Sequence, residues 1–105
     1  MEYLNRVELA GIVGVSKSVT AGDAKGVRFS VVTANASRKK DGLITVDNEW
    51  HNVIAWNVPE HDMNAIVKGA KVKITGRLRY QRYTDSNGVE RTFTEILASS
   101  VKVND

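Results

Sequence analysis

The sequence predicts an all-β fold, a small closed barrel of five strands with one short helix between the third and the fourth strand. Residues 71–83 alternate between polar and apolar side chains, which is the period-two pattern of a long strand. Residues 57–69 change to a helical spacing and contain the single proline of the chain. Glycines recur near the expected bends, as they do in small barrels.

Length and composition set the first limits on function. A chain of 105 residues fits one domain, and we expect a single domain over residues 1–105. Cysteine is absent, which excludes disulfides and thiolate metal sites. The first residues lack the basic and apolar regions of a signal peptide, and no apolar run is long enough to span a membrane. We therefore expect a cytoplasmic protein with no membrane contact, no cofactor and no bound metal.

The first half of the chain predicts two strands separated by a polar loop. Residues 5–13 and 28–35 alternate as strands, and Gly11 and Gly14 indicate a bulge or tight bend in the first of them. Residues 15–27 are polar and predict a loop with an irregular strand.

Residues 36–48 form a turn-rich, basic segment, which predicts a loop or an extended hairpin arm. The net charge of the chain is only +3, but its cations concentrate in Arg38, Lys39 and Lys40 and in residues 68–82. Clustered cations beside aromatic rings are typical of a nucleic-acid surface. The alternative is a solvated face that protects an exposed strand from aggregation.

The third strand, residues 49–56, carries both tryptophans of the chain. Trp50 and Trp56 share one face and stand roughly 20 Å apart at the usual strand rise. Val53 and Ala55 share the other face and suit a small barrel interior. Both indoles are then expected on the outer surface, where large rings need a reason. The alternative places either ring in the core or at a subunit contact.

The helix is expected within residues 57–69. Pro59 suits the first helical position, and the apolar stripe consists of Met63, Ile66 and Val67.

The fourth and fifth strands form a long hairpin with one basic face. Four cations and a terminal ring share the odd positions of residues 71–83; these are Lys71, Lys73, Arg77, Arg79 and Tyr83. The Asn87-Gly88 pair predicts a type I′ turn, because both central residues of that turn need positive φ. Residues 91–97 are rich in β-formers and predict the returning strand.

Three strands, a helix and two strands fit a barrel of the oligonucleotide-binding (OB) type. Four blocks resemble the bacterial single-stranded DNA-binding protein (SSB) family: residues 5–11, RFSVVT, EWHNVIAW and KGAKVKITGRLRYQRYTDSNGVERTFTEI. The resemblance covers residues 5–103. It implies a homotetramer, with a dimer as the alternative, that binds single-stranded DNA without sequence preference in DNA replication, recombination and repair.

The resemblance also implies roles for individual residues. Bases are expected to stack on Trp50, Trp56 and Tyr83, and His51 is expected near subunit contacts rather than on a metal. Cations that line the DNA path are expected at Lys68, Lys73, Arg77, Arg79 and Arg82. The charge pattern adds Lys71, Arg38, Lys39 and Lys40 as phosphate-binding residues.

Two departures from the family pattern concern one ring and the end of the chain. Ser37 stands where many family members carry a further aromatic residue. The family normally continues into a flexible segment whose acidic tip recruits partner enzymes, and these residues stop at Asp105. Partnership with replication or repair proteins is therefore left open.

Other classes fit less of the sequence. A primosome-type OB adaptor, tailless and dimeric, fits the length, but the Glu-Trp-His block and the basic hairpin fit SSB better. A protein-interaction barrel would use the rings as interface anchors. A cold-shock RNA chaperone lacks its Gly-Phe-Gly-Phe pattern here. An enzyme is the weakest alternative, because the sequence has no nucleophile elbow, phosphate loop or metal-ligand spacing.

Overall fold

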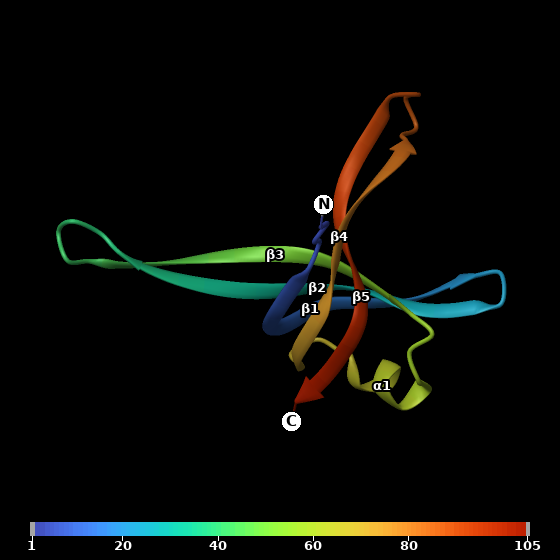
Figure 1. The fold of residues 1–105 in the computed structure, drawn as a ribbon, viewed down its shortest axis with the longest axis horizontal. Coiled ribbons are helices and arrows are strands. Elements are labelled where there is room, and N and C mark those ends of the chain that lie inside the picture. Colours follow the sequence, from blue (N-terminus) through green and yellow to red (C-terminus); the bar gives the residue numbers. More distant parts are fainter. Residues whose placement is uncertain (1, 105) are drawn as a thin grey trace.

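The computed structural model describes residues 2–104 and confirms the predicted barrel, so both ends of the expected domain lie outside the described residues. Its elements are β1 (Val7–Ala21), β2 (Ala24–Arg38), β3 (Ile44–Trp56), α1 (Glu60–Ala65), β4 (Lys71–Thr84) and β5 (Glu90–Asn104). The sheet closes in the order β1-β2-β3-β5-β4, and β4 returns to pair with β1. Figure 1 shows α1 beside one end of the barrel.

The core lies inside the barrel and is built from alternate strand positions. The buried members are Val13, Val27, Phe29, Val31, Val53, Ala55, Ile66, Val72, Ile74 and Ile96. Val53 and Ala55 point inward as predicted, because the pleat sends successive side chains to opposite faces. After α1, Ile66 is buried as expected, whereas Val67 is exposed.

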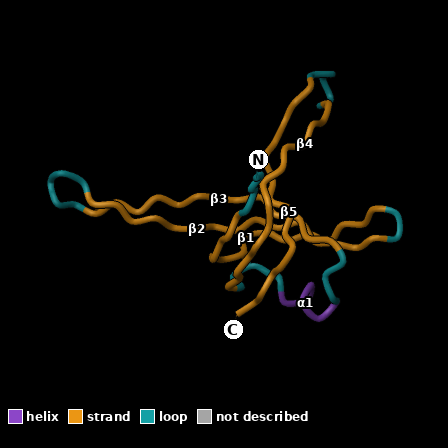
Figure 2. Tube along the Cα trace, in the orientation of Figure 1, coloured by secondary structure: helices purple, strands orange, loops and turns teal. Residues whose placement is uncertain are grey.

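Three two-stranded arms leave the barrel (Figure 2). The β1–β2, β2–β3 and β4–β5 hairpins point in different directions, and strands continue almost to each tip. Residues 15–27 form most of the β1–β2 hairpin, although the sequence predicted a loop with an irregular strand there. For residues 36–48 the sequence predicted a loop or an extended hairpin arm, and the structure shows the hairpin arm. The loop prediction was wrong because both faces of an arm meet solvent, which removes the apolar alternation that marks a strand.

The bend predicted in the first strand is present. The register of β1 with β2 shifts between Val13 and Ser16, which includes Gly14. A second shift, in the pairing of β4 with β5 between Thr75 and Gly76, leaves Ser99 of β5 unpaired where the β4–β5 arm leaves the barrel. Bulges bend a strand and increase its twist, so they allow one strand to serve both the barrel wall and an arm.

The turn of the β4–β5 arm differs from the prediction. Gly88 N–H donates to the carbonyl of Asp85 at 3.0 Å, and Asp85 N–H donates to the carbonyl of Val89 at 2.9 Å. Gly88 has φ of +79°, whereas Asn87 is not among the described residues with positive φ. The type I′ turn is therefore wrong, and the loop is one residue longer with a left-handed glycine at its end. Asp85 favours it, because one carboxylate oxygen accepts from the amides of Asn87 and Val89.

Candidate nucleic-acid interface

Both indoles lie on the outer face of β3, as predicted. Trp50 is 61% exposed and Trp56 is half-buried. Each ring lies against a glycine of another strand. A Cβ added at Gly14 of β1, on the far side of β2, would be 2.5 Å from Cζ3 of Trp50, and one at Gly26 of the adjacent β2 would be 2.8 Å from Cε3 of Trp56. The glycines therefore leave room for the rings to rest on the sheet while their other sides meet solvent.

Ile54, between the two indoles on the same face, is fully buried although it is outside the barrel core. Its partner across the strand pair is Arg28 of β2. Nη2 of Arg28 lies 3.5 Å from Oε2 of Glu95 on β5. Because β3 lies between β2 and β5, the Arg28 side chain crosses the outer face of β3. An arginine thus occupies the surface between the indoles.

Glu95 receives a second arginine from β4. Nε and Nη2 of Arg79 donate to Oε1 of Glu95 at 3.0 and 2.7 Å. The carboxylate is 1% exposed, and its Oε2 accepts no hydrogen bond. Its burial is compensated by two cations, Arg28 and Arg79, from two different strands.

An open groove of about 690 Å³ connects one indole with the basic strand. Its lining residues are Leu4, Asn5, Arg6, Trp56, Thr75, Gly76, Arg77, Leu97, Ala98 and Ser99. Trp56 and Arg77 therefore face a common space, with the Leu97 side chain between their strands. A planar ring, a cation and an apolar floor are the components that a stacked nucleotide needs.

Tyr83 lies farther along the same face of β4, on the arm. Its ring is exposed and meets Phe93 edge to face, with the ring centroids 5.8 Å apart. Arg82 points to the opposite face and lies 3.6 Å from Glu90. Tyr83 therefore continues the face of Arg77 and Arg79, whereas Arg82 does not.

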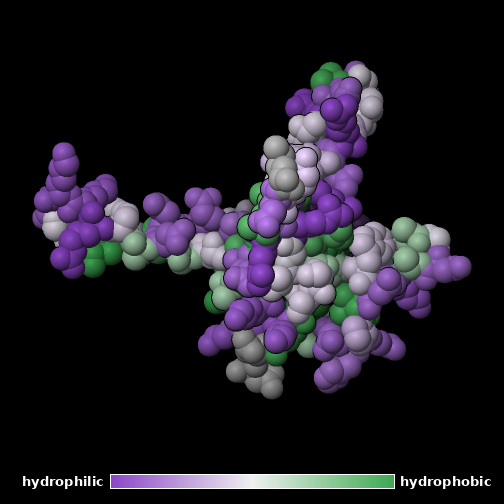
Figure 3. All heavy atoms as spheres, viewed as in Figure 1, coloured by the Kyte–Doolittle hydropathy of each residue, from purple (hydrophilic) through white to green (hydrophobic). Residues whose placement is uncertain are grey.

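The remaining predicted cations lie elsewhere. Lys71 and Lys73 stand at the barrel end of β4, where the strand pairs with β1, and Lys68 follows α1. Residues 38–40 lie at the tip of the β2–β3 arm (Figure 3), where hydrophilic side chains gather. The structure thus brings Trp50, Trp56, Arg77 and Arg79 into one face and leaves the other cations around it.

His51 points toward the inner side of β3, where its Nε2 lies 2.9 Å from Oγ1 of Thr33. Ser37, at the position without the further aromatic ring, lies 3.0 Å from the Thr45 hydroxyl. Residues 2–104 contain no cluster of three His, Asp or Glu side chains that could hold a metal ion. No helix in that range has the length and hydropathy to cross a membrane.

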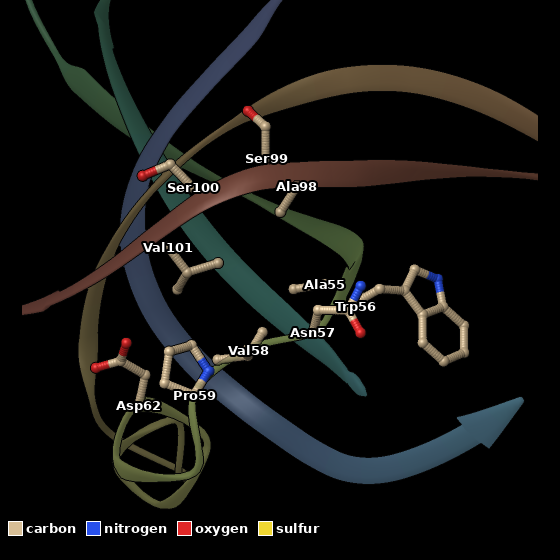
Figure 4. A pocket seen from close by; sticks show the side chains of 10 residues that line it. All are labelled: Ala55, Trp56, Asn57, Val58, Pro59, Asp62, Ala98, Ser99, Ser100 and Val101. Atoms are coloured by element: carbon tan, nitrogen blue, oxygen red, sulfur yellow. The ribbon is translucent and has the colours of Figure 1, made fainter. Parts of the chain in front are cut away.

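A smaller cavity of about 120 Å³ lies at the end of β3, between the chain that leads into α1 and β5. Figure 4 shows the Trp56 indole directed away from the other side chains of this cavity. Asn57, with φ of +57°, turns the chain there. The exposed side of the indole therefore belongs to the groove with Arg77 rather than to this cavity.

Sequence reasoning missed Arg28, Glu95, Gly14 and Gly26 as contributors to this face. For Arg28 a signal was present: Phe29 and Val31 point inward, so Arg28 had to share the outer face with the indoles. Glu95 follows the same rule, as the neighbour of buried Ile96.

Residues 4–104 match the Single-strand binding protein family. The Single-stranded DNA-binding protein of Xanthomonas axonopodis pv. citri is 33% identical over 95% of this chain and 57% of its own length. The mitochondrial Single-stranded DNA-binding protein 1-B of Xenopus laevis is 28% identical over 93% of this chain and 74% of its own.

A solved structure of the Plasmodium falciparum SSB complex with ssDNA has a similar fold, with a TM-score of 0.87 at 22% identity over 100% of this chain and 98% of that one. The chain spans only 57%, 60% and 63% of the length of three bacterial relatives that it matches.

Proposed function

Because the chain belongs to the single-strand binding protein family, we propose that it binds single-stranded DNA without sequence preference and protects it in DNA replication, recombination and repair. The observation that carries this proposal is the outer face of β3, where Trp50 and Trp56 flank a surface crossed by Arg28. The names of the bacterial relatives support the same ligand.

Stacking accounts for the preference for single strands. We propose that unpaired bases stack on Trp50, Trp56 and Tyr83, which is worth about 1–3 kcal/mol per base and tolerates any sequence. Duplex DNA hides the faces of its bases, so it cannot use these rings. The function requires binding only and no catalytic step.

Phosphates are proposed to bind the lysines and arginines around this face. Those proposed are Arg38, Lys39, Lys40, Lys68, Lys71, Lys73, Arg77, Arg79 and Arg82. Each phosphate neutralised releases counterions, so log K is expected to fall with log salt concentration by about 0.7 per contact.

We propose that the chain assembles as a homotetramer, through a surface that includes β1. Residues 7–11 of β1 pair with β4, whereas pairing with β2 begins only at Ile12 within the described residues. Ile12 and Val15 are exposed nearby, and His51 is proposed to lie near a subunit contact. Mass in solution, measured with and without oligonucleotide, distinguishes a tetramer from the dimer expected of a primosome-type adaptor, which the family match does not favour.

The proposed place of action is the cytoplasm, in association with the nucleoid, where replication exposes single strands.

Titration with oligo-dT tests the proposed function directly. Tryptophan fluorescence should be quenched as the indoles stack, and the midpoint of the titration should move to higher oligo-dT concentration as salt is added. Duplex of the same length is the control and should quench little. Absence of quenching at low salt would contradict DNA binding and favour an interaction barrel that uses the rings as protein anchors.

A further inference from the structure

The ion cluster on the outer face consists of one buried acid and two partly exposed arginines. Glu95 is 1% exposed, whereas the side chains of Arg28 and Arg79 are 49% and 28% exposed. Each arginine side chain therefore contacts the carboxylate and still has part of its surface in solvent. Arginine has five N–H donors in a planar fork, so it can hold the acid and a second anion at once.

The cluster spans most of the barrel wall. Arg28 belongs to β2, Glu95 to β5 and Arg79 to β4, and β3 with its two indoles lies between β2 and β5. Arg28 crosses β3 at Ile54, two residues before Trp56 and four after Trp50. A strand whose bases stack on both indoles would cross this part of β3, which brings its phosphates near Arg28.

We propose that Glu95 is a positioning residue, which holds Arg28 and Arg79 in place so that their exposed N–H groups bind phosphates of a strand stacked on Trp50 and Trp56. Long side chains lose rotamer freedom when they bind a ligand, and a buried acid that fixes them beforehand removes part of that cost. This inference rests on the proposed binding of single-stranded DNA and adds Arg28 to the phosphate-binding residues.

Electrostatics alone and the positioning role predict opposite changes in DNA affinity when Glu95 is neutralised, so the direction of the change tests the proposal. Neutralising a carboxylate near an anionic ligand raises the positive potential and should tighten binding. If Glu95 instead positions the arginines, its neutral isostere should weaken binding, because Arg28 and Arg79 lose their charge-assisted partner and become mobile.

The experiment compares Glu95→Gln with Glu60→Gln, using anisotropy of a labelled oligo-dT and thermal unfolding of each variant. Glu60 is a matched control because it is an exposed glutamate in the first turn of α1 and does not line the groove of Trp56 and Arg77. Glu95→Gln should weaken binding about three- to tenfold, whereas Glu60→Gln should change it less than about twofold. Affinity of Glu95→Gln equal to or tighter than wild type would overturn the positioning role.

Two substitutions of Arg28 decide the question if Glu95→Gln fails to fold. Arg28→Lys keeps the charge but lacks the planar fork. It should bind as weakly as Arg28→Ala, and wild-type affinity in Arg28→Lys would overturn the proposal. If the wild-type protein itself does not bind oligo-dT, the proposed function is overturned. That result can be told apart from a difference in affinity among the variants.

Discussion

The β2–β3 and β4–β5 arms end in the same kind of turn but carry charge in different ways. In both, a glycine amide donates to the residue three positions earlier, Gly42 to Lys39 and Gly88 to Asp85. The β4–β5 arm pairs its arginines with its own acids, for example Arg91 Nε with Asp85 at 2.7 Å. Within residues 2–104, residues 38–40 at the other tip take part in no ion pair shorter than 4.0 Å.

The side chains on the faces of the two arms also differ. On the β2–β3 arm, the exposed side chains of Ile44 and Val46 extend the face of Trp50 toward the basic tip. On the β4–β5 arm, Tyr83 packs on Phe93. The side chains of the β4–β5 arm are therefore held by contacts within the arm, whereas the cations at the tip of the β2–β3 arm remain available to a ligand.

The largest expected effect concerns the root of the β4–β5 arm. A Cβ at Gly76 would lie 2.3 Å from the carbonyl oxygen of Leu97, which is backbone and cannot move aside. We expect Gly76→Ala to lower the free energy of unfolding by about 3 kcal/mol, measured by urea denaturation. Gly14→Ala is the matched variant near the root of the other arm, where the nearest atom belongs to the Trp50 ring. It should cost less stability and weaken DNA binding instead; equal stability losses would contradict this distinction.

The next effect concerns the three proposed stacking rings, which should differ in how much they contribute to stability. Trp50→Ala should weaken oligo-dT binding by about 1–3 kcal/mol with little change in unfolding midpoint, because that ring is mainly exposed. Trp56→Ala should show a similar loss of affinity with a larger loss of stability, since its ring is half-buried. Tyr83→Ala is the comparison on the other arm. Unfolding of Trp50→Ala would return that ring to a structural role.

Salt dependence should distinguish the arms by their free charge. Replacing Arg38, Lys39 and Lys40 by Gln should reduce the slope of log K against log salt by up to about 2, at about 0.7 per phosphate lost. The matched control replaces Lys71 and Lys73, which lie at the barrel end of β4, and tests whether cations outside the indole face contribute equally. An unchanged slope in the tip variant would remove the β2–β3 arm from the DNA path.

The smallest effect is a local pH dependence in the β4–β5 turn. The hydrogen bond from Arg91, with the amides of Val89 and Asn87, lowers the pKa of Asp85 below its ordinary value. A lowered pKa stabilises the folded turn above the ordinary Asp range, and this stabilisation is lost as the pH falls through the lowered value. The protection factors of the Asn87 and Val89 amides, which compare each exchange rate with the intrinsic rate at the same pH, should therefore fall on acidification. In Asp85→Asn this dependence should vanish; if it persists, another group is responsible.

Elements with a buried face were predicted correctly from the sequence, whereas elements without one, and contacts between distant strands, were not. The strand of residues 71–83 was correct to within one residue, because buried Val72 and Ile74 impose the period. The loop prediction for residues 15–27 failed because none of residues 15–25 is buried, so they show no apolar alternation.

The candidate site likewise has a part that could be predicted from the sequence and a part that could not. The outward faces of Trp50 and Trp56 follow from alternation within one strand. The link from Arg28 to Glu95 depends on β2 and β5 flanking β3, which is set by closure of the barrel. No local pattern contains that information, so the contact between Arg28 and Glu95 could not be predicted from the sequence.

The seam between β1 and β4 has a consequence for how the protein acquires its structure. The three hairpins join neighbouring segments and can form locally, but Val7 pairs with Gly76, which is far from it in the sequence. Contacts between such distant segments require a large loop to close, and they slow folding. During synthesis, the β1–β2 and β2–β3 arms can therefore form on the ribosome before the barrel, which cannot close until β5, the strand between β3 and β4, has emerged.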